Sequence, residues 1–232
     1  MWLGVACTGV SKYTVAVMIT NQFSVRENQY QEFGSNKLDL YKSLLQPHFL
    51  FNSLNNLYAI SIHRSEQTPE AIAGLSQLLE RIVRSSRMDL IPLSEEIGLI
   101  EDYLKLERIW LGKNAFFLDF QVKGNTTDFC IPPLAIYTLV ENAFKHGVRG
   151  SGNKGWITVH LVVRSDRFIL KIRNSFMAVR KESQDGTASK PGLGMEAVKK
   201  LLDGSYRKRY VLDARTIGDV FAVDLIIGRI AA

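Results

Sequence analysis

The sequence predicts an α+β protein in which a helical hairpin precedes an α/β sandwich, a mixed sheet with helices on one face. Apolar residues recur three and four positions apart from residue 38 to about residue 110, which is helical spacing. After about Asn114 they alternate instead, which is typical of strands. Predicted helices at 132–146 and 193–203 interleave with these strands, and this order favours helices layered on a sheet.

Three helices are predicted in the first half, at 38–62, 70–88 and 93–110. Thr68 is expected to cap the second helix, with Pro69 at its first position. Ser94-Glu95-Glu96 is expected to cap the third helix, which bridges to the second domain. The short turn after the first helix predicts an antiparallel hairpin, whose apolar stripes suit a dimeric four-helix bundle.

Four strands are predicted in the second half, at 115–122, 157–163, 168–173 and 220–227. The second and third form a hairpin around Ser165-Asp166-Arg167, and the fourth closes the sheet. His160 falls within a strand and is expected to be structural. His63 lies in the turn of the helical hairpin and is expected to be solvated, so neither histidine is assigned to chemistry.

Composition narrows the classes of protein to consider. A chain of 232 residues with 46% hydrophobic content suits one large domain or two small ones. Cys7 and Cys130 match no metal-ligand spacing, so the sequence implies neither a disulfide scaffold nor a zinc site. The net charge of +6 is mild, and the basic cluster at 207–209 lacks interleaved aromatic residues. Solvated surface is therefore preferred there to nucleic-acid binding.

Residues 1–36 are predicted to be an apolar segment followed by a polar connector. Met1–Thr20 is mostly apolar, but Lys12 divides it into runs too short to span a bilayer alone. No basic region precedes the apolar stretch, which argues against a secretory signal. The residues leave three alternatives open, namely the remnant of a last membrane-spanning helix, an interfacial helix and an ordinary amphipathic element.

The segment Val140–Gly147 places a carboxylate, an amide, an ammonium and an imidazole within two predicted helical turns. At helical spacing Glu141 and Lys145 project together, as do Asn142 and His146. One amide oxygen beside substrate phosphates is a sufficient protein ligand for Mg²⁺. The cationic and imidazole groups can meet phosphate charge. An amphipathic helix with a solvated Glu/Lys pair is the alternative that this segment leaves open.

A second polar cluster lies at 44–57, where His48 and Asn52 share the face of a predicted helix with further amides. Pro47 removes a backbone donor just before the histidine and can bend the helix there. An imidazole with an ordinary pKa near 6.5 is mostly neutral at pH 7 and therefore nucleophilic. A structural or surface histidine is the alternative for this segment alone.

Together, the string QPHFLFNSLN at 46–55 and the string ENAFKHG at 141–147 strongly resemble the LytS-like family of sensor histidine kinases. The resemblance covers roughly residues 37–228. The first string is very specific to that family. The second is similar to the N-box of the superfamily that joins gyrase, histidine kinases and certain chaperones.

This resemblance implies roles for five residues. His48 would be the phosphoacceptor, Glu141 the base or polarising carboxylate, and Asn142 the Mg²⁺ ligand. Lys145 and His146 would line the phosphate side of an ATP site.

Gly192 and Gly194 open the helix predicted at 193–203, and glycines at a helix N-terminus permit close approach of phosphates. The pair resembles the family's G-box, and residues 180–191 before it resemble the lid over ATP. Asn174 stands where histidine kinases typically place the Asp that binds the adenine amino group. An amide oxygen can still accept that bond without charge assistance, which predicts retained but weaker adenine binding.

Other positions depart from the family. Ala197 and Lys200 replace the Asn and Arg that often follow the G-box, so the family's contacts for lid closure are not carried over. Glu80-Arg81 departs from the usual Arg-aromatic pair of the second helix.

The resemblance implies a protein histidine kinase of a two-component signal-transduction system. It would use ATP and Mg²⁺ to phosphorylate His48 and would pass the phosphoryl group to an aspartate of a response regulator. It also implies a homodimer, a helical dimerisation and phosphoacceptor region at 37–112 and an ATPase domain at 113–232. The catalytic region is expected in the cytoplasm, at the inner face of the cell membrane, with membrane association through residues 1–36.

Two other functions stay open. An ATP-binding pseudokinase or scaffold without phosphotransfer is suggested by Asn174 and the G-box departures. An ATPase of the same superfamily would hydrolyse ATP through Glu141 and use the hairpin only to dimerise.

Overall fold

The computed structural model describes residues 47–63, 65–112, 115–148, 155–176, 193–207 and 209–229. The expected N-terminal segment, the expected lid and Gly192 lie outside the described residues. All described residues belong to one structural unit within Tyr41–Ala232. Within the described ranges, no helix combines the length and apolar character needed to cross a membrane.

The helical half contains α2 (Pro47–His63), the 3₁₀ turn η1 (Ser65–Gln67), α3 (Thr68–Ser85) and α4 (Leu93–Leu111). Helix α3 packs on α4 through a stripe of buried residues at helical spacing. This stripe consists of Ala71, Leu75, Leu78 and Ile82. An ion pair adds to the packing, since Arg81 Nε lies 3.0 Å from Asp102 Oδ2 of α4.

In this helical half, three predicted helix ends were wrong by a few residues. Gln67 rather than Thr68 is the N-cap of α3, because η1 leads directly into the helix. Helix α3 ends at Ser85 rather than Met88, and the Ser86 hydroxyl bonds the Val83 carbonyl (2.9 Å), which competes with further helix. Pro92, not Ser94, is the N-cap of α4.

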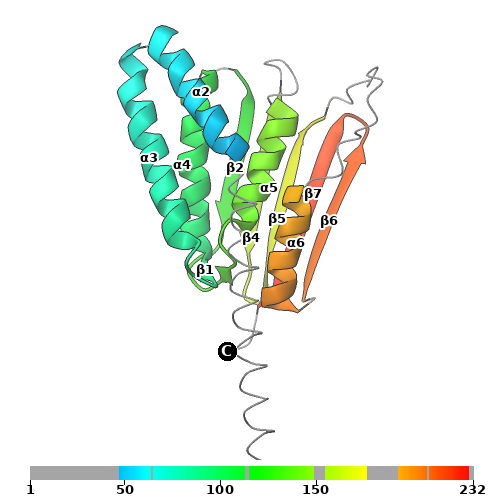
Figure 1. Cartoon of the computed structure of the whole chain (residues 1–232). Coiled ribbons are helices and arrows are strands. Elements are labelled where there is room, and N and C mark those ends of the chain that lie inside the picture. Colours follow the sequence, from blue (N-terminus) through cyan, green and yellow to red (C-terminus); the bar gives the residue numbers. More distant parts are fainter. Residues whose placement is uncertain are drawn as a thin grey trace, which may run out of the picture. The chain divides into compact units, whose positions relative to one another are not determined.

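The main sheet has the order β2-β4-β5-β7-β6 (Figure 1). Its strands are β2 (Phe117–Lys123), β4 (Trp156–Val163), β5 (Arg167–Ser175), β6 (Tyr210–Ile217) and β7 (Val220–Gly228). Strands β2 and β4 are parallel and the other neighbours are antiparallel, so the sheet is mixed. The predicted β4–β5 hairpin and the predicted fold class are confirmed.

The prediction that 220–227 closes the sheet was wrong, because β7 is an inner strand and the unpredicted β6 forms the edge. Strand β6 is exposed along most of its length and therefore shows no clear apolar alternation. Two short strands, β1 (Ile91–Pro92) and β3 (Cys130–Ile131), were also missed and pair with each other.

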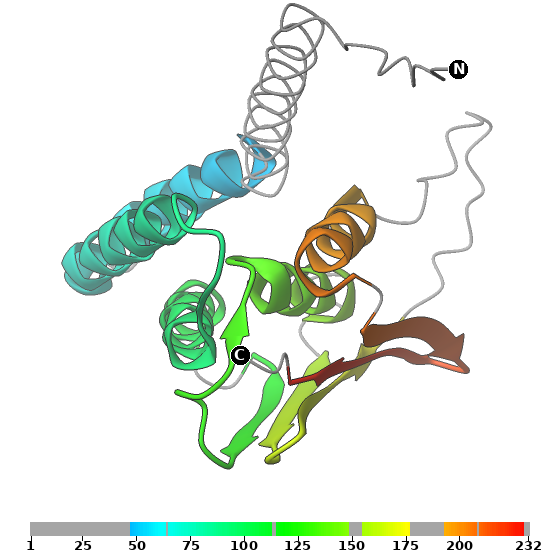
Figure 2. The same cartoon turned by 90° about the horizontal axis from the view of Figure 1, so that it is seen from below.

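Helices α4, α5 (Ala135–Ala143) and α6 (Leu193–Tyr206) lie on one side of the sheet (Figure 2). Alternate residues of β4 and β5 face these helices and form the core. These core residues are Ile157, Val159, Leu161, Phe168, Leu170 and Ile172. The hydroxyl of buried Tyr206 bonds the Cys130 carbonyl and holds the end of α6 against β3.

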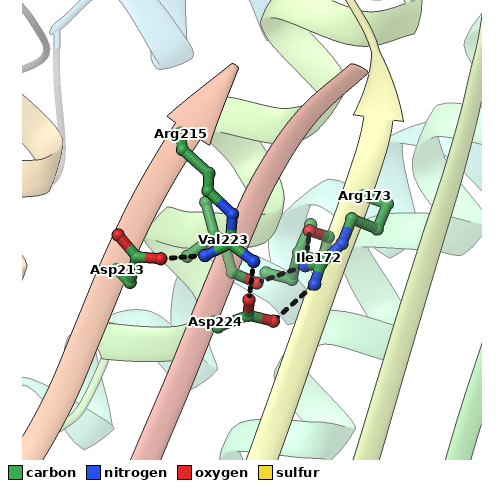
Figure 3. Close-up of polar contacts among 6 residues, drawn as sticks. All are labelled: Ile172, Arg173, Asp213, Arg215, Val223 and Asp224. Carbon is green, nitrogen blue, oxygen red and sulfur yellow. Dashed lines mark hydrogen bonds and ion pairs between the residues drawn. The ribbon is translucent and has the colours of Figure 1, made fainter. Parts of the chain in front are cut away.

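The other side of the sheet carries charged side chains. Asp224 in β7 lies between Arg173 in β5 and Arg215 in β6 (Figure 3). Its Oδ1 is 2.6 Å from Arg173 Nη2, and its Oδ2 is 3.0 Å from Arg215 Nη2. Arg215 also pairs with Asp213. On the same side His160 Nε2 lies 2.7 Å from Asp119 Oδ2, as fits its predicted structural role.

Candidate functional site

The predicted helix at 132–146 changes character at its end. Helix α5 stops at Ala143, and Phe144–Val148 forms a π-helical turn, η2. The predicted helix is therefore α-helical only to Ala143, and wider i→i+5 bonding follows in the segment that carries Lys145 and His146. Such turns occur frequently at functional sites.

The start of α5 is held by an acid from another helix. Glu96 of α4 is fully buried, and its carboxylate accepts hydrogen bonds from three backbone N–H groups. The donors are Leu134 (3.0 Å to Oε2), Ile136 (2.9 Å to Oε1) and Tyr137 (3.0 Å to Oε1). Burial raises the pKa of Glu96 to about 7, although the three hydrogen bonds lower it.

This acid was expected to help cap its own helix, and its contact with α5 was missed. A sequence signal for it existed. Glu96 shares helical spacing with Ile100, Tyr103 and Glu107, which lie on the buried face of α4. Acids on an apolar stripe are rarely fully buried without hydrogen-bond partners.

Asn142 of α5 and Gly194 of α6 lie in close contact. A β-carbon added to Gly194 would stand 2.8 Å from Asn142 Nδ2 and 3.2 Å from Thr138 Cγ2. Only glycine fits between these groups without displacing them. The two candidate motifs that are distant in sequence are thus adjacent in the fold.

Asn174 and Gly147 form a second close contact. Asn174 of β5 is fully buried, and a β-carbon on Gly147 would lie 2.7 Å from its Cβ and its Nδ2. Asn174 Nδ2 donates to the Ser175 carbonyl (2.8 Å), and the Ser175 hydroxyl donates to the Gly147 carbonyl (3.0 Å). Asn174 Oδ1 is buried without a hydrogen-bond partner among the described residues. A buried acceptor in this state costs free energy unless a water molecule or a ligand supplies a donor.

The remaining polar residues of the site differ in exposure. Glu141, Asn142 and Lys145 are partly buried, and His146 is exposed. The pKa of His146 is lowered, first because neighbouring protein partly desolvates its ring and second because of the Lys145 ammonium. Its imidazole is therefore predominantly neutral at pH 7.

Glu141 lies near the buried phenol of Tyr103 in α4. Burial raises the pKa of Tyr103 well above its usual value, and the charges of Glu107 and then Glu141 raise it further. Tyr103 also packs edge-on against Phe144, the first residue of η2, with ring centroids 5.7 Å apart. Helix α4 therefore contacts both ends of the segment that carries Glu141 and Asn142.

The predicted site residues fall into three groups. The structure brings Asn142 to Gly194 and places Asn174 beside Gly147, at the end of the segment with Lys145 and His146. His48 lies in the first turn of the described α2, and its side chain is outside the described part of the structure, as is Gly192.

Comparison with known proteins gives matches to histidine kinases. Residues 36–115 match a family model described as histidine kinase. Sensor protein LytS of Staphylococcus epidermidis is 25% identical over 159 residues, which cover 68% of this chain and 27% of that protein. Sensor histidine kinase YpdA of Escherichia coli is 29% identical over 161 residues, which cover 68% of this chain and 28% of that protein.

A solved histidine kinase domain, from the Erythrobacter litoralis EL346 blue-light activated histidine kinase, aligns with a TM-score of 0.46 and 14% identity. The alignment covers 85% of this chain and 95% of that domain. The chain spans about a quarter of the length of the curated relatives named above. Its sequence matches therefore make this chain similar to LytS-like sensor histidine kinases.

Proposed function

We propose that this chain is the catalytic region of a sensor histidine kinase, which transfers the γ-phosphoryl group of ATP to His48. The observation that carries this proposal is the contact of Gly194 with Asn142, because it joins a glycine at a helix N-terminus to a polar ligand group. The match to the histidine kinase family model, which includes His48, supports the same reaction.

The residues present fit an adenine nucleotide. Asn174 Oδ1 is a buried acceptor that lacks a partner among the described residues, and the adenine amino group is a donor of matching polarity. The bond from Asn174 Nδ2 to the Ser175 carbonyl fixes the amide so that its oxygen remains available. The 6-oxo group of guanine would instead place two acceptors together, so we expect ATP to bind better than GTP.

Asn142 would hold Mg²⁺ through its side-chain oxygen, and the ion would neutralise charge on the transferred phosphoryl group. Lys145 would meet phosphate charge, and neutral His146 would donate a hydrogen bond to a phosphate oxygen. Glu141 would polarise the attacking imidazole. A nitrogen–phosphorus bond forms at His48, and the bond from the γ-phosphorus to the β–γ bridging oxygen breaks, releasing ADP.

The phosphoimidazole would then pass its phosphoryl group to an aspartate of a response regulator, as the family resemblance implies. We further propose the division into regions 37–112 and 113–232, with residues 1–36 associating with the inner face of the cell membrane.

A homodimer is part of the proposal. Leu54, Tyr58 and Ile62 of α2 follow one another at helical spacing and are more than half exposed. Ile72 and Val83 of α3 are also large, apolar and exposed. A second copy of this hairpin would cover these residues in a four-helix bundle. Tyr58→Glu should lower the mass measured by light scattering to that of a monomer, and an unchanged dimer mass would contradict this arrangement.

The central test is phosphorylation of the full chain with γ-labelled ATP and Mg²⁺. Acid-labile, alkali-stable label on the wild type that is lost in His48→Ala is expected. His63→Ala is the matched control, since His63 lies at the other end of the same helix and should keep the label. Label that persists in His48→Ala would refute the assignment of the phosphoacceptor.

A scaffold that binds ATP without phosphotransfer is the second candidate function. Asn174 favours it, because an amide stands where histidine kinases typically place an Asp. ATP binding by calorimetry without any label would support the scaffold and refute the kinase.

A further inference from the structure

Helix α4 presents a buried polar face to α5. Glu96, Ile100, Tyr103 and Glu107 recur at helical spacing, and none is more than 2% exposed. Two acids on a fully buried stripe are unusual, since burying a carboxylate is costly unless it is hydrogen-bonded. These acids belong to neither the nucleotide contacts nor the phosphoacceptor described above.

Glu96 supplies what the first turn of α5 lacks. A helix leaves its first N–H groups without intrahelical partners, and a polar N-cap side chain usually satisfies one of them. The N-cap of α5 is Leu134, which has no polar side chain. Both oxygens of Glu96 instead accept from Leu134, Ile136 and Tyr137, across an interface between two helices.

Leu134 has a backbone geometry that needs such support. Its φ of 66° lies in the left-handed region, which is uncommon for a bulky residue other than glycine. The Leu134 N–H bonds Glu96, and its carbonyl accepts from the Thr138 hydroxyl at 2.7 Å. Hydrogen bonds to both its N–H group and its carbonyl therefore fix Leu134, where the chain enters α5.

The same contacts lead to the candidate site. Thr138 Cγ2 is one of the atoms that would meet a β-carbon on Gly194, at 3.2 Å, beside Asn142 Nδ2 at 2.8 Å. A continuous path thus runs from Glu96 through Leu134 and Thr138 to the contact between Gly194 and Asn142. A shift of α5 along α4 would move Asn142 relative to Gly194.

We propose that Glu96 is a positioning residue for the nucleotide site, which sets the place of Asn142 and Glu141 by holding the N-terminus of α5. This role rests on the proposed function, because it concerns the same site. Glu96 contacts neither ATP nor His48 in this role and acts only through α5.

The test compares Glu96→Gln with the wild type in the full chain. Glutamine keeps the shape, but its NH₂ group cannot accept a hydrogen bond from a backbone N–H group such as that of Leu134, so α5 should lose part of its anchor. Glu95→Gln is the matched control, since Glu95 is the preceding residue and is exposed. Circular dichroism first establishes that the variants are folded at the temperature used. The Kd of Mg²⁺-ATP is then measured by calorimetry, and the KM and kcat of autophosphorylation by labelling.

We expect Glu96→Gln to raise the Kd of Mg²⁺-ATP at least fivefold and to lower kcat, while Glu95→Gln changes neither. If Glu96 had a purely structural role, Glu96→Gln would lower the melting temperature but leave the Kd of Mg²⁺-ATP and the kcat of the folded protein unchanged. That result would overturn the proposal. Glu96→Asp, which keeps the charge on a shorter side chain, should give an intermediate rise in Kd. If Glu96→Gln does not fold, Glu96→Asp decides, and a wild-type Kd in that variant overturns the proposal.

Wild-type protein that binds no Mg²⁺-ATP would refute the proposed function and this role with it. If the wild type and a folded Glu96→Gln variant bind Mg²⁺-ATP with the same Kd, only the role of Glu96 is refuted.

Discussion

Gly194 at the start of α6 lies against the side chain of Asn142 in α5, so closely that a β-carbon would stand 2.8 Å from Asn142 Nδ2. No real β-carbon keeps that distance from a nitrogen, so any larger residue at 194 must displace the amide. The glycine is therefore required by its neighbour in space, independently of any approach by a phosphate.

Gly194→Ala should weaken Mg²⁺-ATP binding by about tenfold, which corresponds to about 1.4 kcal/mol. The reason is that Asn142 must leave its position. Calorimetric titration measures the effect. Gly204→Ala, an exposed site in the same helix, is the control and should leave the Kd unchanged. If Gly194→Ala and the wild type bind Mg²⁺-ATP with equal affinity, nucleotide binding does not depend on the present position of Asn142.

Asn174→Asp should not increase the stability of the protein, although it introduces the acid that histidine kinases typically have at this position. Asn174 Nδ2 donates to the Ser175 carbonyl at 2.8 Å, and a carboxylate would place an acceptor against that carbonyl. We expect a loss of about 1–3 kcal/mol in the free energy of unfolding, because a buried hydrogen bond is replaced by repulsion. Urea denaturation at pH 7 measures it, and a variant as stable as the wild type would contradict the assigned amide orientation.

Glu96 should make stability depend on pH. Burial raises its folded pKa from 4.5 to about 7, so its contribution is fully present below pH 4.5 and is lost as the pH rises through about 7. The free energy of unfolding of the wild type should fall relative to Glu96→Gln by about 3 kcal/mol across this window. Urea denaturation at several pH values tests this.

The matched control for this titration is Glu95→Gln, whose side chain is exposed. It should follow the pH dependence of the wild type. Parallel curves for the wild type and Glu96→Gln from pH 4.5 to 8 would show that Glu96 does not titrate in this range.

Asp224→Asn should lower the free energy of unfolding by about 1–3 kcal/mol. Asp224 forms ion pairs with both Arg173 and Arg215, and its side chain is only 19% exposed. Asp213→Asn, which removes a half-exposed partner of Arg215, should cost at most about 1 kcal/mol. Thermal denaturation compares the two. The ordering would be refuted by an equal or larger effect at Asp213.

Arg81→Ala should loosen α3 from α4, since Arg81 pairs with the largely buried Asp102 at 3.0 Å. We expect a loss of about 1–2 kcal/mol in the free energy of unfolding. Arg84→Ala, at an exposed position of the same helix, should cost less than about 0.5 kcal/mol. This outcome would explain structurally why Glu80-Arg81 stands in place of the usual Arg-aromatic pair. Equal stability of the two variants would contradict that explanation.

Much of the fold could be predicted from local patterns. Helical spacing identified α4 to within one residue at its end, and alternation identified β4 and β5 with their hairpin. Strand β6 escaped because an exposed edge strand needs no apolar face. The η2 turn escaped because nothing in the residue types of 144–148 distinguishes a π-helical turn from an α-helix.

Residues close along the chain were enough to predict the two motifs around His48 and Asn142 and the periodicity of the elements that carry them. The contacts of Glu96 with the start of α5 and of Gly194 with Asn142 became evident only in the folded protein. These contacts join residues about 40 or 50 positions apart, and a local pattern does not contain the partner of a buried group. The physical reason is that burial can be predicted from spacing, whereas the hydrogen bond that makes burial tolerable depends on which backbone another element presents.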